Sequence, residues 1–148
     1  MSYPINLNIP LPVLQQAEPM TTKVDYIVVS NDFCNLYYTT MLTRGISGTL
    51  SLFKPTAICI NNEVTYVGMY DLMSVLSTQG ISKFLYNNLH FTPILLDSNN
   101  IMIQVTGQIQ FMTFWNQLSQ IKSFSETFIL SFEQTKLLIT KYILKIIN

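Results

Sequence analysis

The chain has 148 residues, which is enough for one domain of ordinary size and argues against two. Its eight Lys and Arg balance eight Asp and Glu, which argues against direct capture of nucleic acid, because neutralising phosphates needs clustered cations. Only 11% of the residues are charged and 49% are hydrophobic. This composition excludes a disordered solubilising chain and suggests that some apolar surface faces a partner.

The N-terminal segment, residues 1–21, holds four of the six prolines. Proline fixes the backbone away from helix and removes hydrogen-bond donors, so this composition predicts an extended arm. The contacts that would dock this arm on the body are Ile9, Leu11 and Val13. Residues 22–148 then predict a single domain.

A long helix is the first predicted element of the domain. Thr22 followed by Asp25 resembles a capping box, and a broad apolar face continues to about Thr43. Gly45 follows and would end the helix. A second, short helical piece is predicted near residues 46–53.

The hydrophobic period then changes from helical to strand-like. Residues 56–60 and 64–67 predict a hairpin with its turn at Asn61-Asn62, and residues 70–78 predict another helix. Four long strands are predicted after it: residues 83–96, 101–111, 124–132 and 137–147. Helices first and an antiparallel sheet afterwards predict an α+β fold in which the helices cover one sheet face.

The last three predicted strands alternate with period two. In each strand, we expect the more apolar set of alternate residues to pack against the helices. In the final strand this set includes Tyr142, and Ile139 is expected on the other face. The opposite face carries Gln, Thr and Ile where a water-facing sheet would carry Lys and Glu. Such a face has the composition of a protein interface, and the alternative is a plain solvent face in an Asn- and Ile-rich protein.

A membrane span and a disulfide framework find no support. Residues 98–121 contain no charge and are long enough to cross a bilayer as a helix, but their Asn and Gln side chains would be costly in hydrocarbon. No basic segment opens the chain, so we expect no secretory signal. Cys34 and Cys59 lack metal-ligand or redox spacing, and we expect them to be buried, reduced thiols.

Catalytic chemistry finds little support in the sequence either. The chain has one histidine, His90, which excludes any site that needs several, and we expect it to be a surface or interface residue. Glu63, Glu126 and Glu133 form no obvious carboxylate pair, and the five glycines are not clustered into a phosphate loop. The sequence predicts no enzyme, no metal and no cofactor.

Three motifs of the chain are distinctive in their residue types and spacing. Phe33-Cys34-Asn35-Leu36-Tyr37-Tyr38-Thr39-Thr40-Met41, followed by Arg44, resembles the first helix of the nuclear transport factor 2-like family, in particular of its small export-related branch, whose members pair with the large subunit of the TAP-type mRNA export receptor. Val105-Thr106-Gly107-Gln108 resembles a strand shared by the whole family, and residues 124–130 resemble the strand that follows it. Together these matches span nearly all of the chain beyond the arm.

The resemblance implies a cone of bent antiparallel sheet with about three helices in its concave side. It also implies that the other sheet face pairs with a second domain of the same fold. The protein would then be a non-catalytic subunit of a nuclear mRNA export receptor, present in nucleus and cytoplasm and at the nuclear pore, with FG nucleoporins bound indirectly through the large subunit. The candidate interface residues are Asn88, His90, Gln104, Thr106, Gln108, Thr127, Ile129, Ile143 and Lys145.

Two of these positions correspond to known partner contacts of the family. Lys145 stands where the resemblance implies an arginine that pairs with an acid of the large subunit, and a lysine keeps the charge without the bidentate geometry. His90 stands where an aspartate would pair with an arginine, so it departs from the pattern.

The family offers two alternative functions. One is a homodimeric import carrier of the Ran and FG-nucleoporin type. By resemblance, its Ran site would fall on Asn61, Asn62, Met112 and Phe114. None of these residues is acidic, which argues against Ran binding. The other alternative is a small enzyme of the same cone fold, such as a dehydratase or isomerase, which would need Tyr37, Tyr38 or an acid to point into an open cavity.

One segment is unlike either branch of the family. It follows the strand motif Val105-Thr106-Gly107-Gln108 and contains Phe111, Met112, Phe114 and Trp115. Two interpretations stay open: the segment folds back onto the body, or it is an exposed anchor for a partner, for which aromatic side chains are favoured.

Overall fold

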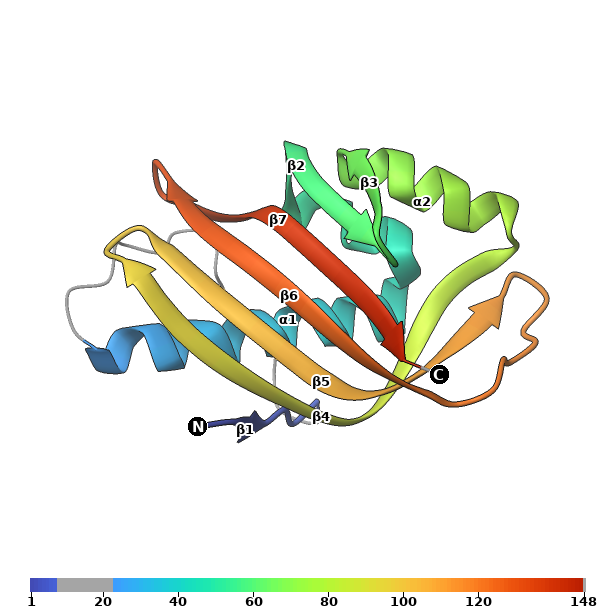
Figure 1. Cartoon of the computed structure of the whole chain (residues 1–148), viewed down its shortest axis with the longest axis horizontal. Helices are drawn as coiled ribbons and strands as arrows, with labels where there is room; N and C mark the ends of the chain where they lie inside the picture. Colours follow the sequence, from blue (N-terminus) through green and yellow to red (C-terminus); the bar gives the residue numbers. More distant parts are fainter. Residues whose placement is uncertain (8–22, 148) are drawn as a thin grey trace.

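A computed structural model describes residues 1–7 and 23–147 and shows one bent sheet with a long helix across its concave side (Figure 1). The strand order is β1-β4-β5-β6-β7-β2-β3. In the described part of the chain the elements are β1 (Tyr3–Pro4), α1 (Lys23–Gly48), the 3₁₀ turn η1 (Leu50–Leu52), β2 (Phe53–Asn61), β3 (Val64–Val67), α2 (Met69–Thr78), β4 (Ile81–Asp97), β5 (Asn100–Thr113), β6 (Lys122–Glu133) and β7 (Lys136–Ile147).

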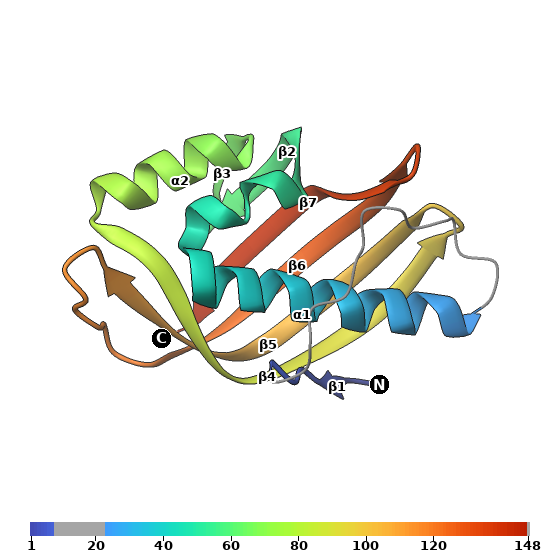
Figure 2. The same ribbon diagram turned by 180° about the vertical axis from the view of Figure 1, so that it is seen from behind.

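Helix α1 lies over the sheet, as Figure 2 shows from behind. Its buried side chains recur at helical spacing, from Phe33 through Tyr37 and Tyr38 to Met41, so one face is apolar and packs inward. Gly45 interrupts the helix with φ 72°, and a Cβ there would lie 2.9 Å from the Ser82 carbonyl oxygen. The predicted stop is therefore confirmed as a kink. The expected Thr22–Asp25 capping box lies outside the residues whose side chains are described.

The hairpin forms one residue later than expected. Asn61 pairs with Val64, and the turn residues Asn62 and Glu63 have φ 45° and 75°, the positive values that a two-residue hairpin turn requires. The expectation of a wholly antiparallel sheet is wrong at this point, because β2 runs parallel to β7. The two strands lie far apart in the chain, and local alternation carries no information about their relative direction.

The bend of the sheet is centred on β4 and β5. The pairing register shifts between Asn87 and His90, where Asn88 adopts φ 54°. Gly107 lies opposite, and a Cβ there would be 2.9 Å from the Asn87 carbonyl oxygen and 3.0 Å from that of Asn88. A β-bulge bends and twists its strand, and this close backbone approach explains why a glycine occupies the position. The resulting concave side holds α1.

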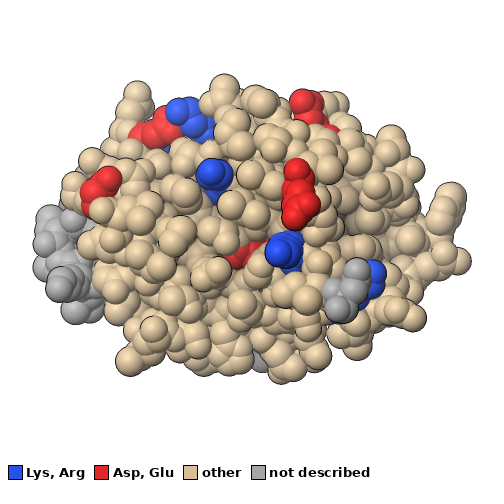
Figure 3. All heavy atoms as spheres, in the orientation of Figure 1, with Lys and Arg blue, Asp and Glu red and all other residues tan. Residues whose placement is uncertain are grey.

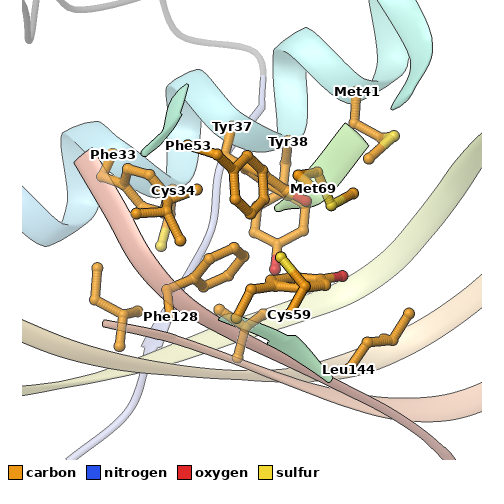
Figure 4. Packing of buried hydrophobic residues seen from close by; sticks show 14 of the residues in the cluster. Phe33, Cys34, Tyr37, Tyr38, Met41, Phe53, Cys59, Met69, Phe128 and Leu144 are labelled. Carbon is orange, nitrogen blue, oxygen red and sulfur yellow. The ribbon is translucent and has the colours of Figure 1, made fainter. Parts of the chain in front are cut away.

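The inner sheet face and α1 form the hydrophobic core (Figure 4). As the alternation predicted, Phe128 and Leu144 are buried on this face together with Tyr142. Ile139, however, is also fully buried, which contradicts its predicted place on the other face. The pairing shifts between Ile129 and Leu130 so that Leu130 lies opposite Ile139, and this bulge moves the side chain to the inner face.

The described part of the N-terminal arm lies along the edge of β4. Tyr3 pairs with Phe91, their ring centroids are 5.2 Å apart, and the Ile5 amide donates to the Leu89 carbonyl oxygen at 3.0 Å. Tyr3, Ile5 and Leu7 are half-buried against the core. The expected docking contacts through residues 9, 11 and 13 lie outside the described residues.

Cys34 and Cys59 are unpaired and buried, as expected. Among residues 1–7 and 23–147, no helix is long and apolar enough to cross a bilayer.

Candidate functional site

The outer face of the sheet, on the side opposite α1, brings the predicted interface residues together. Gln104 pairs with Thr127, which pairs with Ile143, and these three side chains form one row across β5, β6 and β7. A neighbouring row contains His90, Thr106 and Lys145, with Ser125 between the last two. All nine predicted side chains are exposed or half-exposed. We call this surface, together with the apolar row described next, the outer face.

An apolar row also crosses the outer face, and Ile129 is its one member among the predicted interface residues. The pairing register joins six strands side by side at Ile94, Met102, Ile129, Lys141, Ile58 and Val67. Five of these six side chains are apolar, and Ile94, Ile58 and Val67 are 40%, 36% and 61% exposed. Figure 3, which views the sheet from this side, shows charged groups scattered over it rather than gathered.

The polar groups of the outer face bond within the sheet and with one another. His90 Nδ1 lies 3.2 Å from the Asn88 carbonyl oxygen, and the Asn88 side-chain amide donates to Gln108 Oε1 at 3.2 Å. These contacts use a backbone carbonyl and side-chain amide groups. The geometry suits a surface that hydrogen-bonds at its rim.

The aromatic segment of residues 111–115 divides into two parts. Phe111 and Met112 are half-buried strand residues, because β5 continues to Thr113. Phe114 and Trp115, by contrast, are 58% and 82% exposed. Leu118 and Ile121, which the sequence analysis did not single out, are also more than half exposed. Polar residues separate Leu118 from Ile121 in the sequence, so the two form no periodic apolar pattern that would have predicted their exposure.

The inner face contains one carboxyl group, which sequence reasoning missed. Glu126 lies on β6 between Phe124 and Phe128 at period two, and it is fully buried. Its Oε1 accepts a hydrogen bond from the Tyr38 hydroxyl at 2.7 Å, and its Oε2 accepts one from the Tyr142 hydroxyl. The signal was the position itself, since an acid in line with two buried phenylalanines must face the core.

Burial dominates the electrostatics of this cluster. Desolvation raises the pKa of Glu126 to about 7, although the hydrogen bonds from Tyr142 and Tyr38 act in the opposite direction. Burial, together with the nearby Glu126 charge, also raises the pKa of Tyr38 and of Tyr142 well above the usual value. Both hydroxyls therefore keep their protons and act as donors.

Aromatic rings fill the space around Glu126. Tyr37 and Phe128 have ring centroids 4.8 Å apart, and those of Tyr38 and Tyr86 are 4.7 Å apart. Tyr37 and Tyr38 expose none of their surface and point toward the sheet (Figure 4). The hydroxyl of Tyr86 is buried without a hydrogen-bond partner among the described residues. These tyrosines thus lie inside the packed core.

Within the described ranges, no three His, Cys, Asp or Glu side chains are grouped so that they could hold a metal ion.

Comparisons with known proteins identify the fold. No family model and no curated protein matches the sequence. Among solved structures, nuclear transport factor 2 from Cryptosporidium parvum is similar with a TM-score of 0.64 and 15% identity, over 83% of this chain and 95% of that one. A ketosteroid isomerase-like protein from Erwinia carotovora atroseptica is similar with a TM-score of 0.64 and 11% identity, over 86% and 99%.

A third similar structure is an uncharacterized protein with a cystatin-like fold from Caulobacter vibrioides, with a TM-score of 0.61 and 14% identity over 84% of this chain and 89% of that one. The chain therefore has the nuclear transport factor 2-like fold, as its motifs indicated. At these identities the likeness shows the fold alone, and function has to be argued from the surfaces of this chain.

Proposed function

We propose that the protein is a non-catalytic subunit that pairs, through the outer face, with a second domain of the same fold in a TAP-type large subunit. The observation that carries the proposal is the row of five apolar side chains across six neighbouring strands. Water-facing sheets normally alternate apolar-in and polar-out, so such a row is out of place unless another surface covers it.

The outer face also supplies what the rim of an interface needs. Gln104, Thr106 and Thr127 flank the apolar row with uncharged hydrogen-bonding groups. A permanent subunit interface typically buries ~2,000 Å² or more and is more apolar than the remaining surface. A sheet of this length, poor in charge, offers a surface of that kind to a sheet of the same shape.

The export assignment depends on the resemblance of the first helix. In the structure, the motif residues Phe33, Tyr37, Tyr38 and Met41 are all buried in the concave side. They support the fold directly, and they support the partner because the export-related branch shares this motif. In this proposal the large subunit contributes the contacts to FG nucleoporins, and the pair acts at the nuclear pore.

The test is a pairing assay with the matching domain of the TAP-type large subunit from the protein's own source. Size-exclusion chromatography with light scattering should give a one-to-one complex. Ile129→Glu and Ile143→Glu should each weaken pairing by about a hundred-fold or more, because they bury an unpaired charge. Leu42→Glu is the matched control, since Leu42 is 45% exposed on α1, which lies on the other side of the sheet from the outer face (Figure 2).

The outcomes separate the alternatives. All three variants should keep the circular dichroism spectrum of the parent chain. Retained pairing in both outer-face variants would contradict the interface. Recovery of a self-pair near twice the chain mass, without a heterodimer, would favour the homodimeric carrier instead.

A further inference from the structure

The connection between β5 and β6, residues 114–121, forms one end of the molecule in both ribbon views (Figures 1 and 2). We call it the aromatic loop. Four of its eight side chains are apolar and more than half exposed: Phe114 58%, Trp115 82%, Leu118 54% and Ile121 59%. This gathering of exposed apolar groups differs from singly scattered ones, which need no explanation.

The start of the aromatic loop is held by Thr113. The Thr113 hydroxyl oxygen accepts from the Trp115 amide at 3.3 Å and from the Gln117 amide at 3.0 Å. The Thr113 amide in turn donates to the Gln117 carbonyl oxygen at 2.9 Å, and Asn116 turns the chain with φ 60°. Trp115 is therefore displayed on a closed, hydrogen-bonded turn.

Bonds to neighbouring elements hold the rest of the aromatic loop. The Phe114 amide donates to the Gly80 carbonyl oxygen at 3.0 Å. The Phe111 amide donates to the Ser119 hydroxyl at 2.8 Å, and the Ser119 amide donates back to the Phe111 carbonyl oxygen at 2.9 Å. A loop fixed in this way loses little conformational entropy when a partner covers it, which favours tight association.

A small hollow of about 60 Å³ lies beside the aromatic loop. Its walls include Leu85, Asn87, Gln108 and Gln110 from β4 and β5, and Ile121 from the loop itself. Gln108 also belongs to the outer face, so the hollow connects that face with the aromatic loop. Leu85, Ile109 and Ile121 give the hollow an apolar lining that suits an aliphatic side chain.

Charge decides which kind of surface can cover this end of the molecule. Residues 98–121 contain no Lys, Arg, Asp or Glu. Binding to an anionic lipid surface uses several Lys and Arg beside the inserted aromatic residues, whereas the loop carries none and Lys122 is the one cation that adjoins it in the sequence. An uncharged, largely apolar protein surface is the complement that these residues fit.

We infer that the aromatic loop and its hollow are a second contact with the partner domain that covers the outer face. Phe114 and Trp115 pack on an apolar surface of that domain, and the hollow takes one of its aliphatic side chains. The inference rests on the proposed function. It is supported by the continuity through Gln108, by the lack of charge and by the fixed loop geometry.

Trp115 is the single tryptophan of the chain and therefore reports on its own burial. The probe is a large-subunit domain in which every tryptophan is replaced by phenylalanine and which still gives the light-scattering complex. Pairing should move the tryptophan emission to shorter wavelength and protect it from acrylamide. Trp115→Ala should speed dissociation about thirty-fold, as removal of an interface hot spot does.

Two further variants complete the experiment. Thr113→Val keeps Trp115 but removes the hydroxyl that holds the turn, and it should speed dissociation about five-fold. Tyr70→Ala is the matched control, because Tyr70 is an aromatic residue on α2 that is also mostly exposed, at 66%, and its removal should leave dissociation unchanged.

Each result has one meaning. Pairing with unchanged Trp115 emission and unchanged dissociation overturns the second contact and leaves the proposed pairing intact. The absence of any complex overturns both. An emission shift that depends only on the concentration of this chain, or that lipid vesicles produce, identifies a different occupant and also overturns the inference.

Discussion

The two faces of β5, β6 and β7 solve opposite problems with alternate residues of the same strands. On the inner face, the buried Glu126 carboxylate has donors on both oxygens, and its neighbours are closely packed rings. On the outer face, Ile129 is half-exposed in the middle of an apolar row. The chain completes its inner face by itself, whereas a second surface covers the outer face in the function that we propose. Substitutions on the two faces should therefore change different measured quantities.

The largest expected effect on stability comes from the inner face. Phe128→Ala should lower the free energy of unfolding by about 3–5 kcal/mol, because Phe128 is fully buried among the rings of Tyr37 and Tyr142. Its outer-face neighbour provides the control, and Thr127→Ala should stay within about 0.5 kcal/mol. Urea unfolding of both variants measures the difference. Equal losses would remove the distinction between the faces.

The second effect depends on pH. The pKa of Glu126 is about 7 when folded, above the ordinary 4.5, so the folded state binds this proton more tightly than the unfolded state. Its contribution to stability is therefore fully present below pH 4.5 and is lost as the pH rises through about 7. The loss should approach about 3 kcal/mol at alkaline pH. Unfolding in urea at pH 5 and pH 8 measures it.

Two glutamate variants assign that pH dependence. Glu126→Gln should flatten the stability difference between pH 5 and pH 8. Glu133→Gln should leave the difference in place, since Glu133 is 38% exposed beside Lys54 on the surface. If the Glu126 variant keeps the slope of the parent chain, the buried carboxyl is not its source.

A smaller effect on stability is expected at Gly107, where β4 and β5 bend. Gly107→Ala would place a Cβ 2.9 Å from the Asn87 carbonyl oxygen, which would force the two strands apart. We expect a loss of about 1–3 kcal/mol in thermal or urea unfolding. Ala at Gly80, where a Cβ meets no atom within 4 Å but φ is +81°, separates backbone strain from steric contact. A Gly107 variant as stable as the parent chain would exclude close approach as the reason for the glycine.

The smallest effect on stability, and a clear one on pairing, belongs to the edge of the apolar row. Ile94 is 40% exposed, so Ile94→Lys should change the free energy of unfolding by no more than about 0.5 kcal/mol. It should still weaken pairing, because the proposed partner must then cover an ammonium group. A titration of the complex measures this. Unchanged affinity would place Ile94 outside the interface.

The sequence allowed prediction of those parts of the fold that depend on local patterns. Alternation placed Phe124 and Phe128 on the inner face, and Gly45 marked the end of the long helix. The parallel pairing of β2 with β7 could not be predicted, because it joins distant strands. The burial of Ile139 could not be predicted either, because a one-residue bulge reverses the face of every residue before it.

The outer face and the Glu126 cluster were also predictable only in part. The polar half of the outer face was visible as uncharged alternation, but the apolar row needed the register of six strands, since Ile58 and Val67 come from the distant hairpin. Glu126 was overlooked because an acid on a strand is ordinarily assigned to water. Its position between two buried phenylalanines was the stronger signal.

The pairing of Tyr3 with Phe91 also bears on biosynthesis. During translation, Tyr3 and Ile5 emerge long before Leu89 and Phe91, so this short stretch of the β4 edge is covered by a segment that has already left the ribosome. Until the two meet, β4 presents unpaired amide and carbonyl groups at one edge, and such edges promote association with other nascent chains. The short N-terminal strand thus protects the newly made chain as well as the finished sheet.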